Sequence, residues 1–147
     1  MATTKIALVM LIMVFASNGV SYSADKNEEM RQYMIKIDPV LTNIQITSRS
    51  ISQKILSLEA ATKHIKEYIV QLRAIEPPAF MAKQHKMILL SFYKMKAGFI
   101  ILSKGDRPGS MPLVKKGAEL LKIAANDIVD FAKKEGLVKA KAEEKKK

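Results

Sequence analysis

The chain has 147 residues, enough for one domain, with 25 lysine and arginine residues, 14 acidic residues and no cysteine. The lack of cysteine excludes disulfides, iron–sulfur centres, thiolate nucleophiles and covalent c-type haem attachment. Packing alone must therefore hold the domain together, and a chain of this length can bury a sufficient core.

Residues 1–23 have the pattern of a secretory signal peptide. Lys5 precedes an unbroken apolar run of 11 residues from Ile6 to Ala16, and small or polar residues follow as far as Ser23. The run is shorter than the roughly 20 residues that a membrane-spanning helix needs. We therefore expect cleavage near Ser23 and export, with an uncleaved anchor as the alternative. An exported domain without cysteine suits a bacterial periplasm best, and secretion is the alternative.

After this segment, apolar residues recur at intervals of three and four, which is the spacing of α-helices. No stretch alternates with a period of two for long enough to form a strand, so the predicted class is all-α. Short connections between the helices predict an up-down-up-down four-helix bundle within residues 24–137. The expected helices span residues 28–56, 58–75, 78–103 and 111–135.

The breaks between these helices differ in clarity. Pro77 and Pro78 end one helix and open the next, and the glycines and prolines of residues 103–112 indicate a loop. The turn near Ser57 has no such signal. Without it, residues 39–75 would form one helix about 55 Å long, against about 37 Å for the third helix. The alternative fold is therefore a long-helix hairpin that completes its core by dimerisation.

On each expected helix, the apolar residues spaced three or four apart form one row along the helix surface. The expected core lies along these apolar rows. Phe92 and Phe99 lie seven residues apart on the same row of the third helix and are predicted to be central. The row of the first helix is expected to continue through Ile55, and that of the last helix to include Ala118.

The surface is predicted to be rich in lysine, because the net charge is +11 and only four of the 25 basic residues are arginine. Lysine is a hydrated point charge without the planar fork that binds phosphate in a bidentate manner, so specific nucleic-acid binding is not expected. The main interpretation is a solvated surface. The alternative is attraction to an anionic surface through lysine-rich faces and the charged tail of residues 138–147, which is expected to be disordered.

The sequence contains no HExxH, GxSxG or glycine-rich phosphate loop, and no residues that pair a nucleophile with a base. A non-enzymatic protein without a cofactor is therefore expected. Met81 and His85 lie one helical turn apart and are the candidate metal ligands, since thioether and imidazole together can bind Cu(I). Methionine is also a common core residue, so the pair is weak support for a metal or haem carrier.

His85 stands in an apolar row, between Met81 and Ile88. A buried imidazole needs hydrogen-bond partners, so a structural role is the favoured hypothesis. If neighbouring helices run antiparallel, the residues that lie at the same height as His85 along the helix axes can be estimated. This estimate predicts three candidate partners: Tyr68 on the second helix, and Asp127 and Asp130 on the last.

Two classes of function remain. The first is an exported, non-catalytic interaction protein that binds a protein partner or an apolar small ligand. The second is a cationic protein that acts at an anionic membrane or a polyanion. Salt dependence separates them, because binding to phosphate groups weakens steeply with salt and apolar binding does not.

Overall fold

The computed structural model describes residues 24–135, and every regular element within them is helical. The prediction of an all-α class is confirmed for this part of the chain. None of the described helices is both long enough and apolar enough to cross a membrane. The predicted signal peptide and the predicted disordered tail lie in residues 1–23 and 136–147, outside the described residues. The elements are α2 (Ala24–Ser52), α3 (Leu58–Ala74), the 3₁₀ turn η1 (Ala79–Met81), α4 (Ala82–Ser103) and α5 (Arg107–Lys134).

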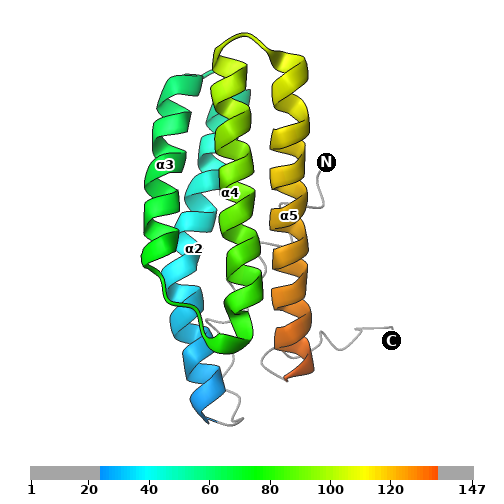
Figure 1. The fold of residues 1–147 in the computed structure, drawn as a ribbon. Helices are drawn as coiled ribbons and strands as arrows, with labels where there is room; N and C mark the ends of the chain where they lie inside the picture. Colours follow the sequence, from blue (N-terminus) through cyan, green and yellow to red (C-terminus); the bar gives the residue numbers. More distant parts are fainter. Residues whose placement is uncertain (1–23, 136–147) are drawn as a thin grey trace, which may run out of the picture.

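The four long helices lie side by side, and α4 stands between α3 and α5 (Figure 1). Helix α4 packs most extensively against α5 and also against α3, which in turn packs against α2. The connection from α3 to α4 lies at one end of the molecule and that from α4 to α5 at the other. Two flanks of α4 are therefore covered by neighbouring helices.

Helices α2 and α3 are separate, so the single long helix considered from the sequence does not form. Helix α2 ends at Ser52, four residues before the predicted end, because Lys54 adopts a left-handed conformation with φ 58°. The Ile55 amide then donates to the Ser50 carbonyl at 2.9 Å. The expectation that Ile55 continues the apolar row is wrong: its side chain is 74% exposed, since the helix has already ended.

The side chain of Ser57 caps the next helix, because its hydroxyl oxygen accepts a hydrogen bond from the Ala60 amide at 3.1 Å. The predicted turn near Ser57 is thus confirmed. Pro39 lies inside α2 on an exposed position. Proline has no amide hydrogen, so the Ile35 carbonyl, four residues earlier, lacks its helical donor. Ile35 is 56% exposed, so this carbonyl lies on the solvent side of α2.

The starts of α4 and α5 differ from the predicted ones. Residues 79–81 form a 3₁₀ turn, in which the Met81 amide donates to the Pro78 carbonyl at 2.8 Å, and α4 begins at Ala82. Helix α5 begins at Arg107 rather than at 111. The Asp106 carboxylate accepts from the Gly109 amide at 2.8 Å and caps the helix, so more than half of the predicted loop is helical.

The core lies on the faces that the four helices turn toward one another. The prediction for Phe92 and Phe99 is confirmed, since both are buried. The prediction for Ala118 is wrong, because Ala118 is exposed and Gly117 is buried instead. At the end of the molecule near η1, the rings of Phe80 and Phe131 stack with centroids 5.1 Å apart.

Two glycines set the close approach of α4 and α5. A Cβ atom on Gly98 would lie 2.5 Å from a methyl carbon of Val114. A Cβ atom on Gly117 would lie 2.8 Å from the Ser91 carbonyl oxygen and 2.7 Å from the Met95 Cγ atom. Because one of these contacts is to backbone, α4 and α5 could not keep this separation with a methyl group between them.

Gly117→Ala should destabilise the protein by about 1–3 kcal/mol, the usual cost of overpacking a filled interface. Urea denaturation followed by circular dichroism measures the change. Lys115→Ala is the control, since an exposed position should change stability by less than about 0.5 kcal/mol. A more stable Gly117→Ala protein would mean that the higher helix propensity of alanine decides, and that α4 and α5 are not in close contact.

Lys54→Gly should stabilise the protein by about 0.5–1 kcal/mol. The left-handed conformation costs an L-residue about 1–2 kcal/mol, and glycine avoids this cost but loses more backbone entropy on folding. The matched control is Lys63→Gly, an exposed site inside α3, which should destabilise by about 1 kcal/mol. Equal losses in the two variants would contradict the left-handed turn.

Candidate functional site

A buried polar cluster joins three helices around His85. The imidazole is 6% exposed. Its Nε2 atom lies 3.0 Å from the Leu72 carbonyl oxygen of α3, and its Nδ1 atom lies 3.1 Å from the Tyr33 hydroxyl of α2. The Tyr33 and His85 rings meet edge to face, with centroids 5.8 Å apart. One side chain of α4 is thus bonded to both α2 and α3.

The partners of His85 determine its tautomer. A carbonyl oxygen can only accept, so Nε2 carries the proton and donates to Leu72. In the neutral ring Nδ1 then has a lone pair and accepts from the Tyr33 hydroxyl. Burial lowers the pKa of His85 from 6.5, and the hydrogen bond to the Leu72 carbonyl partly opposes this change. Burial also raises the pKa of Tyr33, which keeps the phenol protonated as a donor.

The bond from His85 to Leu72 also completes the end of α3. Leu72 is in the last turn of that helix, where carbonyl groups lack donors from the next turn. The Ile75 amide donates to this carbonyl at 3.2 Å. His85 supplies the second donor, so a histidine of α4 helps to cap the helix that precedes it.

The predicted partners of His85 are wrong. Tyr68 lies within hydrogen-bond distance of Thr47, with 3.0 Å between the two hydroxyl oxygens, and its ring meets Phe92 edge to face. Asp127 is half-buried and Asp130 is exposed, and neither is bonded to His85. The prediction considered side chains of α3 and α5 only, whereas the side chain bonded to His85 comes from α2.

Tyr33 is the residue that sequence reasoning missed. It is 2% exposed and lies next to the apolar row of Met30, Met34 and Ile37. A tyrosine beside an apolar row is the available signal, since a buried phenol needs a hydrogen-bond partner. That signal identifies a polar contact in the core but does not say which helix provides it.

The candidate metal pair, Met81 and His85, lies inside the core. Both ring nitrogens of His85 already have partners, and Met81 is fully buried. In the part of the chain that the structure describes, no three His, Cys, Asp or Glu side chains lie close enough to hold a metal ion. A metal at His85 would require breaking its bond to Tyr33 or to Leu72.

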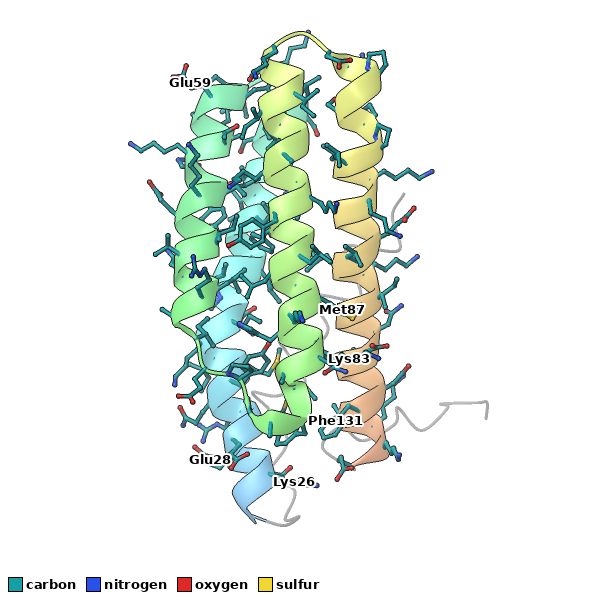
Figure 2. All side chains as sticks on the ribbon, viewed as in Figure 1. Lys26, Glu28, Glu59, Lys83, Met87 and Phe131 are labelled. Atoms are coloured by element: carbon teal, nitrogen blue, oxygen red, sulfur yellow. The ribbon has the colours of Figure 1, made fainter. Side chains whose placement is uncertain are left out.

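A second feature lies on the opposite side of α4, which we call the outer face of α4. Figure 2 labels Lys83 and Met87 on this helix, near the turn that follows α3. Leu90 is 45% exposed and Tyr93 is 38% exposed, although both are large and apolar. The positions of the face recur every three or four residues and are all exposed or half-exposed: Lys83, Lys86, Met87, Leu90, Tyr93, Lys94, Ala97, Ile101 and Lys104.

Charge on the outer face of α4 is of one sign. The sequence has no carboxylate between Glu76 and Asp106, whereas α2, α3 and α5 each carry at least two. Ion pairs in residues 24–135 join Arg31 to Glu28 and Lys116 to Glu119, and none involves a lysine of α4. The Lys96 ammonium lies 5.3 Å from the centre of the Tyr93 ring. Neither ion pair of the described residues involves Lys96, so no carboxylate compensates its charge.

The chain matches no protein-family model, no curated protein and no solved structure. Its own geometry must therefore carry the functional argument. The His85 cluster is buried, and both ring nitrogens of His85 have hydrogen-bond partners, which is typical of a structural contact. The outer face of α4 is accessible, and it carries exposed apolar side chains among positively charged ones. This face is the candidate binding site.

His85 should make stability depend on pH. Because its pKa is lowered in the folded state, the unfolded chain binds more protons between the folded pKa and 6.5. The contribution of His85 to stability is therefore complete above about pH 6.5 and is lost as the pH falls below that value. Urea denaturation from pH 8 to pH 5 should show this decline in the native protein and a smaller decline in His85→Gln.

His64→Gln is the control for the pH series, because it keeps His85 and its two partners in place. The decline between pH 7 and pH 5 should remain in this variant. Parallel stability curves for the native protein and His85→Gln would show that the imidazole is as accessible to protons in the folded state as in the unfolded chain.

Proposed function

We propose that this is an exported, non-catalytic interaction protein, built as an up-down-up-down four-helix bundle, that binds its partner through the outer face of α4. The signal-peptide pattern of residues 1–23 supports export, and the absence of cysteine favours the periplasm over secretion. The charged tail of residues 138–147 follows the bundle domain and is not needed for this binding face.

The observation that carries the proposal is the pairing of exposed apolar side chains with one sign of charge. Leu90 and Tyr93 remain partly in water on the one helix, of the four described, that has no carboxylate. Exposed apolar patches that polar residues surround are typical of interaction sites. Other exposed apolar residues, such as Ile46 on α2 and Val70 on α3, lie on helices that mix both signs of charge.

The buried titratable residues support a role without catalysis. His85 and Tyr33 are neutral, and they bond to each other and to the α3 backbone rather than to an open site. A general base needs access to the proton that it abstracts, and a nucleophile needs such a base beside it. The polar groups of this core are used to position helices.

Site-specific photo-crosslinking in the native host tests the proposal. A photoreactive residue at Leu90 should give a discrete adduct, and the same residue at Ile46, which is 57% exposed on α2, should not. N-terminal sequencing of the exported protein should begin near Tyr22, Ala24 or Asp25. The proposal fails if Leu90 gives no more adduct than Ile46, or if the protein stays inside the cell.

A further inference from the structure

We infer that the partner of the outer face of α4 is the surface of a bilayer rich in anionic phospholipid. This inference rests on the proposed function and names the chemistry of its partner. Helix α4 would lie along the membrane surface, with its apolar side chains among the headgroups and its lysines beside the phosphates. The bundle would stay folded, because the inner face of α4 remains in the core.

Charge complementarity gives the sign of the partner. Lys83, Lys86, Lys94 and Lys104 project from the face, and no carboxylate of α4 neutralises them. Lysines close to an anionic leaflet are attracted to it without any specific geometry. A guanidinium fork would indicate a fitted phosphate site, but the face contains no arginine. A second copy of the chain is a poor partner, since it would present the same positive charge.

The order of side chains along α4 favours a bilayer over an acidic helix. Lys94 lies between Leu90 and Ile101 and interrupts the apolar strip at its middle. A partner helix packed on this strip would bury the Lys94 ammonium. At a bilayer the aliphatic part of lysine stays in the apolar layer while the ammonium reaches the phosphates. Tyr93 suits the same boundary, because it has an apolar ring and a polar hydroxyl.

The dimensions of the face also fit a flat surface. Lys83 and Lys104 are 21 residues apart, which is about 30 Å along a helix, and the apolar side chains lie between them. Helices that bind at membrane interfaces combine such an apolar side with flanking lysines. The neighbouring helices carry exposed carboxylates, including Glu67 on α3 and Glu119 on α5, so the attraction is strongest when α4 itself is closest to the membrane.

Co-sedimentation of the mature protein with vesicles tests the inference. One set contains equal parts of phosphatidylglycerol and phosphatidylcholine, and the other contains phosphatidylcholine alone. The protein should bind the first set at least tenfold more tightly than the second. Raising the salt from 50 to 500 mM should weaken the binding, because screening shortens the reach of exposed charges.

Variants show which surface makes the contact. Leu90→Glu should weaken binding to the anionic vesicles at least tenfold, since it places a carboxylate at the centre of the face. The matched control is Ile46→Glu, at an exposed isoleucine of α2, which should leave binding within twofold. Circular dichroism should show that both variants remain helical. The double variant Lys86→Gln with Lys94→Gln should weaken binding without any change of the apolar strip.

The inference is overturned if the anionic vesicles do not bind the protein, or if Leu90→Glu and Ile46→Glu bind them equally. Equal binding would assign the attraction to other lysines, such as those of the charged tail. In that case the photo-crosslinking result remains independent. A protein adduct at Leu90 together with failed vesicle binding would keep the proposed function and replace the lipid with an acidic protein.

Discussion

The position of α4 depends on a neutral histidine that has two partners. His85 donates from Nε2 to the Leu72 carbonyl and accepts at Nδ1 from the Tyr33 hydroxyl. Both bonds require the same tautomer, and the first also satisfies a carbonyl in the last turn of α3. Because the three groups come from α2, α3 and α4, one imidazole fixes the positions of these helices along their axes relative to one another.

Helix α5 is held to α4 in a different way, by the absence of side chains. Gly98 and Gly117 allow the two backbones to approach, and neither position has room for a methyl group. Polar contacts thus position α4 on one flank and close packing positions it on the other. With both flanks occupied and its inner face in the core, α4 has a single side open to solvent.

The composition of that open side is the basis of the proposed function. A side chain that is partly exposed to water contributes less to packing than a fully buried one, so the fold constrains its identity less. Leu90 is 45% exposed and Tyr93 is 38% exposed, yet both are large and apolar, and the lysines around them have no acidic partners on α4. In the proposed function, the charge of one sign would attract a partner of the other sign, and the apolar side chains would strengthen the contact once water is removed.

The sequence by itself determined the helical class of the described residues, because the three-and-four spacing of apolar residues is a local property that covers whole segments. It also located Phe92 and Phe99 in the core, but it left open whether a turn near Ser57 divides the first long segment into two helices. The predictions of the helix ends were less accurate. Lys54 turns left-handed without a glycine to indicate it, and Asp106 caps α5 within residues that read as a loop.

Tertiary structure alone decided which residues meet. The sequence indicated that His85 is buried and needs partners, but Tyr33 is 52 residues away in the chain, and no local pattern relates the two. The same holds for the outer face of α4: its apolar and basic residues are visible in the sequence, but exposure of Leu90 depends on which side of α4 its neighbours cover. Spacing along a helix fixes the faces of that helix, whereas the packing of the other helices decides which face remains in water.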